Sequence, residues 1–278
     1  MTLFAFTSQI FLLSILAGFL GALTGLGGGV VIIPVLTLLF GVDIRYAMGA
    51  SLASVIATSS GAAIAYVREG LSNIRIGMFL EIATTIGAIF GAYLAARVSS
   101  HGIAIVFGVV LLCSAFASFS KKPGPVPGAV PSPLASRLEL VGTYPGPNGP
   151  TAYSAERVPL GFGVMFGAGT LSGLLGIGSG AVKVLAMDQA MRLPVKVSTT
   201  TSNFMIGVTA AASAGIYLSH GYIDPRIAMP VMLGVLAGSL VGTHVLVRAH
   251  VGTLRAIFAV VIAALGLEMI FNGMAGRI

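Results

Sequence analysis

Long apolar runs separated by short polar breaks make up most of the 278-residue chain. The apolar runs cover residues 8–40, 44–67, 74–98, 101–119, 160–187, 197–218, 226–247 and 252–272. Most of them have the length that a helix needs to cross the roughly 30 Å hydrocarbon core of a bilayer. The pattern predicts an all-α integral membrane protein. Since no basic residue precedes Arg45, the first run is expected to belong to the fold and not to a cleavable signal peptide.

The first run carries a glycine cluster, "GLGGG" (25–29), near its centre. As one helix this run would be about 50 Å long, which is too long for one span and slightly short for two full spans. Glycine also weakens helix interiors. We therefore expect a hairpin of two short helices that meet at residues 25–29, which we call the first tip. Non-helical backbone at membrane depth is tolerated only where protein or a wet cavity surrounds it, so the tip should be internal.

The second half of the chain repeats the first half at a constant offset of 151 residues. The glycines of the first tip recur in "GIGSG" (176–180), which we call the second tip. Five further residues meet identical ones at the same offset: Ser51, Thr58, Tyr66, Arg75 and Arg97 match Ser202, Thr209, Tyr217, Arg226 and Arg248. A shared apolar bias would not produce matching Ser, Tyr and Arg in one register. The sequence therefore predicts two duplicated halves, a common construction among transporters.

The segment between the halves is rich in Pro, Gly and charge, which predicts a water-exposed linker. The expected organisation is a first membrane repeat at 1–119, a polar linker at 120–159 and a second membrane repeat at 160–278. Within the linker, "LELVGTY" and "TAYSAERV" flank a Pro/Gly turn and predict a small β-hairpin.

The distribution of basic residues favours an inverted relation between the halves. If each half is a glycine-tipped hairpin plus three transmembrane helices, a cytoplasmic linker places ten Lys and Arg residues inside the cell. Only four are then left outside, namely Arg45, Arg97, Arg226 and Arg277. Parallel repeats of four spans would split the same residues eight to six. The positive-inside rule favours the ten-to-four arrangement.

Composition excludes a soluble protein. Hydrophobic residues make up 56% of the chain, charged residues 8%, and the mean hydropathy is +1.01, whereas a soluble domain carries about 25% charged residues. The net charge of +7 does not indicate nucleic-acid binding, because no basic cluster interleaved with aromatic residues is present. Cys113 is the single cysteine and is expected to pack inside an apolar helix. The histidines lack metal-ligand spacing and no catalytic or phosphate-binding motif is present, so no cofactor, metal site or enzymatic activity is expected.

The two tips are the first candidate for chemistry. In an inverted duplication they would approach each other near the bilayer midplane, where helix N-termini present free N–H groups that suit a small anion. The candidate backbone donors are Gly27, Gly28, Gly29, Gly178, Ser179 and Gly180. The alternative is that the glycines only permit close helix packing, which is the interpretation we favour for the pairs Gly87/Gly91 and Gly238/Gly242.

A polar stretch follows each tip. The six consecutive polar residues from Ser198 to Asn203 must face protein or a cavity, because facing lipid would be costly. Ser202 and Asn203, together with Ser51 in the first half, are candidate hydroxyl and amide donors to an oxyanion. The alternative is that the hydroxyls bond back to helix carbonyls or link helices to one another.

Two charged residues interrupt the likeness of the halves. Lys183 stands where the first half has isoleucine, and Glu81 stands where the second half has methionine. Lys183 either attracts an anionic substrate, pairs with an acid, or reaches an interface with its long side chain. Glu81 is a candidate for proton coupling, and the alternative is a structural pair with Arg75, Arg97 or Lys183.

The chain resembles the TauE/SafE family of sulfite-exporter-like membrane permeases in four segments, "GFLGALTGLGGGVVIIPVL", "GASLASVIATSSGA", "GTLSGLLGIGSGAVKVLAMD" and "STTTSNFMIGVTA". The resemblance covers nearly the whole chain. It implies the transport of small sulfur-containing anions, such as sulfite or an organosulfonate, by a multi-pass protein of a bacterial or archaeal inner membrane. Ser179 stands where the first tip has Gly28, and its hydroxyl either adds a donor or changes selectivity.

These observations lead to one main hypothesis, a secondary transporter that moves a small sulfur-containing anion by alternating access between the halves. Lys183 would attract the anion and Glu81 would couple transport to protons. The runner-up is an anion channel of the same fold, and a membrane-embedded enzyme or scaffold ranks lower. The expected partners are a small anion, the lipid bilayer, and protons or another coupling ion. A homodimer is left open and nucleic acid is not expected.

Overall fold

The computed structural model describes residues 3–24, 28–68, 72–119, 133–146, 149–178, 180–246 and 251–278. It is mostly helical, as predicted. The first half contains α1 (Leu3–Thr24), α2 (Gly29–Pro34), the π-helix η1 (Val35–Leu39), α3 (Ile44–Arg68), α4 (Ile74–Arg97) and α5 (Ser100–Phe119). Between the halves lie α6 (Pro133–Arg137), β1 (Val141–Gly146) and β2 (Gly149–Ser154). The second half contains α7 (Val158–Leu175), α8 (Gly180–Leu185), the π-helix η2 (Ala186–Ala190), α9 (Val195–Ser219), α10 (Pro225–Leu246) and α11 (Val251–Met274).

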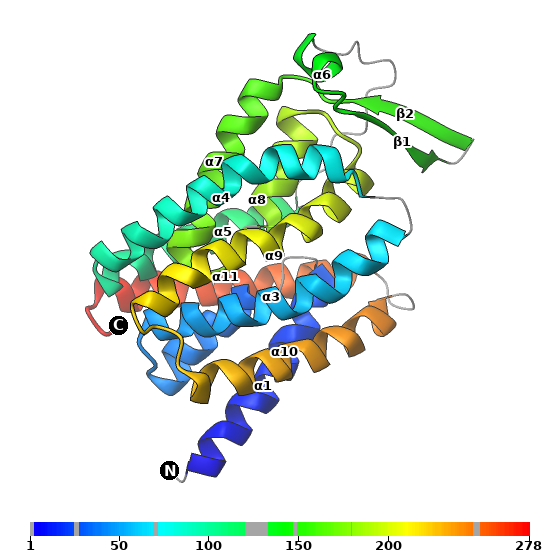
Figure 1. The fold of residues 1–278 in the computed structure, drawn as a ribbon. Helices are drawn as coiled ribbons and strands as arrows, with labels where there is room; N and C mark the ends of the chain where they lie inside the picture. Colours follow the sequence, from blue (N-terminus) through cyan, green and yellow to red (C-terminus); the bar gives the residue numbers. More distant parts are fainter. Residues whose placement is uncertain are drawn as a thin grey trace.

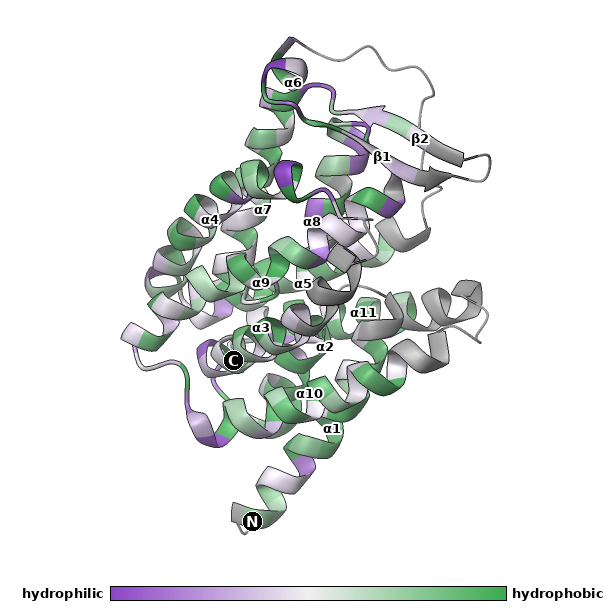
Figure 2. Ribbon diagram, turned by 45° about the vertical axis from the view of Figure 1, so that its right-hand side comes forward, coloured by the Kyte–Doolittle hydropathy of each residue, from purple (hydrophilic) through white to green (hydrophobic). Residues whose placement is uncertain are grey.

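Four helices in the described ranges are long and apolar enough to cross a membrane, namely α1, α4, α7 and α10. On α4, the large apolar side chains Met78, Ile82, Ile86, Phe90 and Tyr93 recur every three or four residues and are each more than half exposed. Such a stripe belongs against lipid. Figure 2 shows the hydrophobic colour over the helical body, with hydrophilic residues gathered around α6, β1 and β2.

Each half begins with a helical hairpin. In the first half, the rings of Phe6 on α1 and Phe40 after η1 meet edge to face with centroids 5.6 Å apart. In the second half, Met191 after η2 packs on Gly161 of α7, and its carbonyl oxygen accepts a 3.0 Å hydrogen bond from the Glu156 N–H. The second arm of each hairpin therefore returns along the first arm.

The returning arms change from α-helix to π-helix at equivalent places. The π segments are Val35–Leu39 and Ala186–Ala190, which differ by the same 151 positions as the sequence repeat. Short π segments are rare and occur frequently at functional sites. The likeness between the halves thus extends from the sequence to the backbone.

Small residues pair helices of one half closely with helices of the other. Gly87 of α4 lies so close to the Phe166 carbonyl oxygen of α7 that a β-carbon there would collide with it, and Gly91 lies against α7 in the same way. Gly238 of α10 stands in the same relation to the Ile15 carbonyl oxygen of α1. The two contacts map onto each other at the offset of 151. The packing role predicted for Gly87, Gly91 and Gly238 is confirmed.

The two long polar helices α3 and α9 lie side by side in the middle of the bundle (Figure 1). Met48 near the start of α3 contacts Tyr217 near the end of α9, with sulfur and hydroxyl oxygen 3.7 Å apart. Farther along α3, Ser59 packs on Gly207 of α9. The residue numbers of the contacts increase along α3 while they decrease along α9, so the two helices run antiparallel.

The linker forms a small unit at one end of the molecule (Figure 1). The predicted β-hairpin is confirmed, since β1 and β2 pair antiparallel with Val141 opposite Ser154. The unit is attached to the helices by an ion pair between Arg75 and Glu139. Asn73, which caps α4, donates from its amide to the Val141 carbonyl oxygen at 3.2 Å and to the Tyr153 hydroxyl at 2.9 Å. Burial raises the pKa of the Tyr153 hydroxyl.

The expected position of Cys113 is wrong. Its side chain is exposed on α5 instead of being packed between helices. Phe116, one turn along the same helix, is 76% exposed. Because α5 is apolar on both sides, the sequence carries no signal of which side meets protein and which meets lipid.

Candidate functional site

The two tips meet the same turn of α3. The Ser51 hydroxyl donates a 2.8 Å hydrogen bond to the Gly176 carbonyl oxygen of the second tip, and Gly29 of the first tip packs directly against that hydroxyl. One turn on, the two methyl groups of Val55 reach both tips. They lie 3.4 Å and 3.2 Å from the places that β-carbons would take at Gly29 and Gly178. Ser51 and Val55 therefore stand between the tips.

Both tips are internal, as predicted, in the parts that the structure describes. Gly28, Gly29, Gly178 and Gly180 are all buried, whereas Gly27 and Ser179 lie outside the described residues. Gly178 has φ = +67°, in the left-handed region that favours glycine, and a β-carbon there would stand 2.8 Å from a methyl group of Ile206. In this conformation the glycines are needed for close packing against protein. A role of their N–H groups toward a ligand stays a prediction.

The two candidate serines hold the second tip. Ser202 of α9 donates to the Gly180 carbonyl oxygen at 3.2 Å, just as Ser51 donates to Gly176. A serine hydroxyl carries one hydrogen, so neither serine has a hydrogen left for an anion in this conformation. Asn203 is half-buried, and its amide makes no hydrogen bond within the described part of the chain. The six polar residues at 198–203 are buried or half-buried, which confirms that they face protein.

Lys183 lies in the middle of the bundle. Its side chain is fully buried, and its ammonium donates a 2.5 Å hydrogen bond to the Thr209 hydroxyl of α9. The alternative that Lys183 reaches a membrane interface is therefore wrong. A buried ammonium needs hydrogen-bond acceptors or a negative charge nearby. The structure places a negative charge close to Lys183, on the other side of the Thr209 hydroxyl.

That negative charge is Glu81 of α4. The Thr209 hydroxyl lies 2.6 Å from Glu81 Oε1, and Thr85 donates to the same oxygen at 3.2 Å. Glu81 is 8% exposed, and its Oε2 atom is buried with no hydrogen-bond partner among the described residues. Of the pairs considered from the sequence, the structure brings Glu81 together with Lys183, through Thr209. Arg75 pairs with Glu139 at the linker instead.

Thr209 is the site residue that sequence reasoning missed. The sequence identifies it as the repeat partner of Thr58, and its seven-residue spacing from Ser202 puts both on one helix face, but it is not among the predicted site residues. Thr58 bonds back to its own helix, to the carbonyl oxygens of Ser54 and Val55 at 3.0 Å and 3.2 Å. The same residue type thus joins two charges in one half and serves only its own helix in the other.

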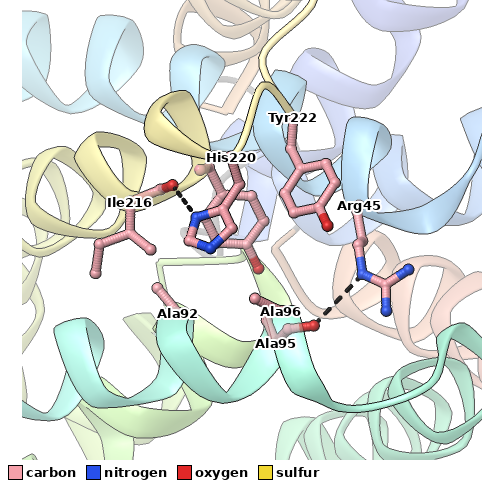
Figure 3. Close-up of a pocket in the computed structure, with 8 residues that line it drawn as sticks. Arg45, Ala92, Ala95, Ala96, Ile216, His220 and Tyr222 are labelled. Atoms are coloured by element: carbon pink, nitrogen blue, oxygen red, sulfur yellow. Dashed lines mark hydrogen bonds between the residues drawn. The ribbon is translucent and has the colours of Figure 1, made fainter.

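A narrow hollow lies at the end of the bundle opposite the linker, and its lining residues include Arg45, Tyr217, His220 and Tyr222 (Figure 3). The Arg45 guanidinium donates to the Ala95 carbonyl oxygen, as the figure marks, and to the Val98 carbonyl oxygen at 2.7 Å. It also stands 5.8 Å from the centre of the Tyr222 ring. Arg45 therefore caps the last turn of α4, where the helix dipole favours a cation. We assign it a structural role.

Metal binding has no support in the described parts of the chain, where no group of three His, Cys, Asp or Glu side chains is placed to hold an ion. The polar groups that the structure gathers are instead one ammonium, one carboxylate and several hydroxyls. Enclosed by long apolar helices, this cluster defines a multi-pass membrane protein of the transporter class, because charged groups at such depth mark substrate or ion pathways.

Comparison with known proteins agrees with this class and gives the family. Residues 10–269 match the family described as Sulfite exporter TauE/SafE, and the chain belongs to that family. It is a probable membrane transporter and not an enzyme.

Several curated relatives match over nearly their whole length. The chain is 27% identical over 270 residues to the probable membrane transporter protein YunE of Bacillus subtilis, covering 94% of this chain and 96% of that one. It is 29% identical over 234 residues to YdhB of the same organism, covering 84% and 86%. The probable membrane transporter protein MJ0441 of Methanocaldococcus jannaschii is 23% identical over 275 residues, covering 94% of each chain. No solved structure matches the chain.

Proposed function

We propose that the protein is a secondary transporter for a small sulfur-containing anion, such as sulfite or an organosulfonate, and that it works by alternating access between two inverted halves. The observation that carries this proposal is the fully buried ammonium of Lys183, three residues after the second tip and in contact with the polar face of α9. A buried positive charge surrounded by hydroxyl groups suits an oxyanion.

Two contacts support the inverted relation. The equivalent helices α3 and α9 run antiparallel. A twofold axis in the membrane plane that relates the two halves requires this, whereas an axis along the membrane normal would make equivalent membrane-spanning helices parallel. The contact of Gly87 with Phe166 also recurs as the contact of Gly238 with Ile15. The contact of the first half with the second is therefore repeated, at equivalent residues, by the second half with the first. Such an arrangement lets the halves exchange conformations, which is the basis of alternating access.

The proposed site lies where the tips meet α3 and α9. Lys183 attracts the anion, and Ser51, Ser202 and Asn203 supply hydroxyl and amide donors. The backbone N–H groups of Gly27, Gly28, Gly29, Gly178, Ser179 and Gly180 complete the set. Since Ser51 and Ser202 now donate to carbonyl oxygens of the second tip, binding requires that tip to move and release them. Glu81 is the proposed proton carrier.

We place the linker, residues 120–159, in the cytoplasm between the repeats 1–119 and 160–278. Arg75, Arg192 and Lys196 stand near the ends of α4, η2 and α9 that face the linker, two of them paired with linker acids. Arg45 lies at the opposite end, bound to the last turn of α4. An excess of basic residues on the linker side is what the positive-inside rule expects of a cytoplasmic face.

The test is sulfite transport by purified protein in proteoliposomes. Wild-type protein is expected to show counterflow, in which unlabelled sulfite inside the vesicle accelerates entry of labelled sulfite. The double variant Ser202→Ala/Asn203→Ala is expected to lose this activity. Ser219→Ala, an exposed serine on the same helix that bonds only to its own helix and to His220, is the matched control. Unchanged counterflow in the double variant would remove the site, and ion currents far above carrier rates would indicate a channel.

A further inference from the structure

We propose that the transported anion and the Glu81 carboxylate take turns as the counter-ion of Lys183, with the Thr209 hydroxyl as the link between the two charges. Each anion charge then crosses together with one proton carried on Glu81, and the transport cycle is electroneutral. This inference rests on the transport function proposed above and specifies its coupling.

The link through Thr209 has a defined polarity. Lys183 can only donate, so the Thr209 oxygen accepts from it at 2.5 Å. The single hydroxyl hydrogen has two acceptors, Glu81 Oε1 at 2.6 Å and the Met205 carbonyl oxygen at 3.0 Å, and the shorter contact is the one to Glu81. No contact within 4.0 Å joins the ammonium directly to the carboxylate. The hydroxyl therefore holds the two charges near each other without a direct ion pair, and an anion can replace the carboxylate without first breaking one.

Both charged groups keep unused capacity. The Glu81 Oε2 atom is buried and accepts no hydrogen bond from any described residue. An ammonium has three hydrogens, and the described residues supply one acceptor, Thr209, to that of Lys183. An anion beside Lys183 would accept hydrogen bonds from the remaining hydrogens of the ammonium. A proton on Oε2 would neutralise the Glu81 carboxylate, which then no longer has Lys183 as its counter-ion.

Charge balance joins the two events. Lys183 and Glu81 sum to zero net charge, so an anion entering alone would leave one uncompensated negative charge away from water, which is costly. A proton that binds to Oε2 from the aqueous side restores neutrality, and it leaves when the anion leaves. No bond other than this O–H bond forms or breaks. Since Glu81 binds one proton, each cycle carries one negative charge and one proton.

Within the described part of the chain, Lys183 is the charged group that acts on Glu81, and the other buried acid, Asp188 of the second hairpin, lies on η2. Helix α7 contains no ionisable side chain between residues 158 and 175. On α9 the ionisable residues are Lys196 and Tyr217, more than one helical turn from Thr209 on either side, and α8 brings Lys183. The cluster is also present in one copy only. Its repeat counterparts are Ile32, Thr58 and Met232, which carry no charge.

The test measures sulfite movement in proteoliposomes under an imposed pH difference or an imposed membrane potential. Wild-type protein is expected to accumulate sulfite along the proton gradient and to be insensitive to the potential. Glu81→Gln, which mimics the protonated acid and cannot release a proton, is expected to lose accumulation driven by pH by about tenfold or more, measured relative to its own rate of sulfite counterflow. Accumulation by Glu81→Gln equal to that of wild type, or accumulation that follows the potential, would overturn the proposal.

Threonine variants test the link separately. Thr209→Val is expected to flatten the dependence of transport on pH, and Thr209→Ser to restore it, because only the hydroxyl is needed. Thr58→Val is the matched control, since it makes the same change at the equivalent position without a charged neighbour. Equal effects of Thr58→Val and Thr209→Val would contradict the role of Thr209. Absence of sulfite counterflow in wild-type protein would instead remove the transport function itself.

Discussion

The hydroxyl of Ser51 on α3 donates a 2.8 Å hydrogen bond to the carbonyl oxygen of Gly176, 125 residues farther along the chain. This bond ties the polar helix of the first half to the glycine tip of the second. On its other side the same hydroxyl touches Gly29, so one atom is shared by both tips. The relative position of the tips therefore depends on Ser51.

Replacing Ser51 by alanine should lower stability. The variant leaves the buried Gly176 carbonyl oxygen without its partner, which costs about 1–3 kcal/mol. A lower melting temperature in detergent is the expected result. Ser60→Ala is the control, since Ser60 is exposed and bonds only to the Ile56 carbonyl oxygen of its own helix. Equal melting temperatures for the two variants would mean that the bond between Ser51 and Gly176 does not form.

Replacing Gly29 by alanine should be destabilising in a way that depends on Ser51. The new methyl group would displace the Ser51 hydroxyl and break its bond to Gly176, at a cost of about 1–3 kcal/mol for overpacking. In a Ser51→Ala background the nearest remaining contacts are ordinary, so the cost should shrink.

The measurement for this pair is a double-mutant cycle on melting temperature. Gly163→Ala on α7 is the control, because a β-carbon there meets nothing within 4 Å. Additive effects of Gly29→Ala and Ser51→Ala would show that the two positions do not touch.

Removing one charge of the buried cluster should cost more than removing both. Lys183→Met leaves Glu81 buried without its counter-charge, which costs about 3–5 kcal/mol when a buried pair is broken. Lys183→Met with Glu81→Gln should recover much of that loss, since no net charge remains. Thermal unfolding of the two variants checks this. A double variant as unstable as Lys183→Met would mean that the two charges do not interact.

Asn73 should control how firmly the linker unit is attached. Its side-chain oxygen accepts from the Ile76 N–H at 3.0 Å and so caps α4, while its amide nitrogen holds β1 and β2. Asn73→Asp keeps the cap and loses the amide donor, whereas Asn73→Ala loses both. Loss of the cap lowers the free energy of unfolding by about 1 kcal/mol. Both variants should therefore be cut faster in the linker by added protease, and Asn73→Ala alone should also melt earlier.

The attachment should weaken at high pH. Burial raises the pKa of Tyr153, so the folded state favours the protonated phenol. This contribution to stability is complete below the ordinary tyrosine pKa of about 10, and is lost as the pH rises through the raised value. Protease cleavage of the linker should therefore accelerate above pH of about 10 in wild type. Tyr153→Phe should lose this particular pH dependence and keep the rest.

Much of the fold could be predicted because the membrane simplifies the pattern. The apolar runs predict the helices, the glycine clusters predict the hairpins with internal tips, and the Pro/Gly turn predicts the linker strands. Each of these features depends on local hydropathy or on turn residues. The side of α5 on which Cys113 lies could not be predicted, because an apolar helix looks alike on its lipid and protein faces.

The charged cluster was only partly predictable. Lys183 and Glu81 stand out as charges in apolar runs, and pairing between them was among the alternatives. Thr209 does not stand out, because a threonine that joins two charges and one that bonds back to its own helix have the same sequence signature. Only the packing of α9 against α4 and α8, a relation between distant segments, separates it from Thr58.

The charged cluster of Glu81, Thr209 and Lys183 has no charged counterpart at the equivalent positions Met232, Thr58 and Ile32. The distribution of buried charge is therefore asymmetric, although the helices of the two halves correspond to each other. In a carrier of this design, the outward-open and inward-open shapes are related by swapping the roles of the halves. That swap would exchange an ammonium and a carboxylate for an isoleucine and a methionine. For the proposed carrier, the two shapes are therefore expected to be unequal in energy, and the empty protein is expected to favour the shape that opens toward one particular side of the membrane.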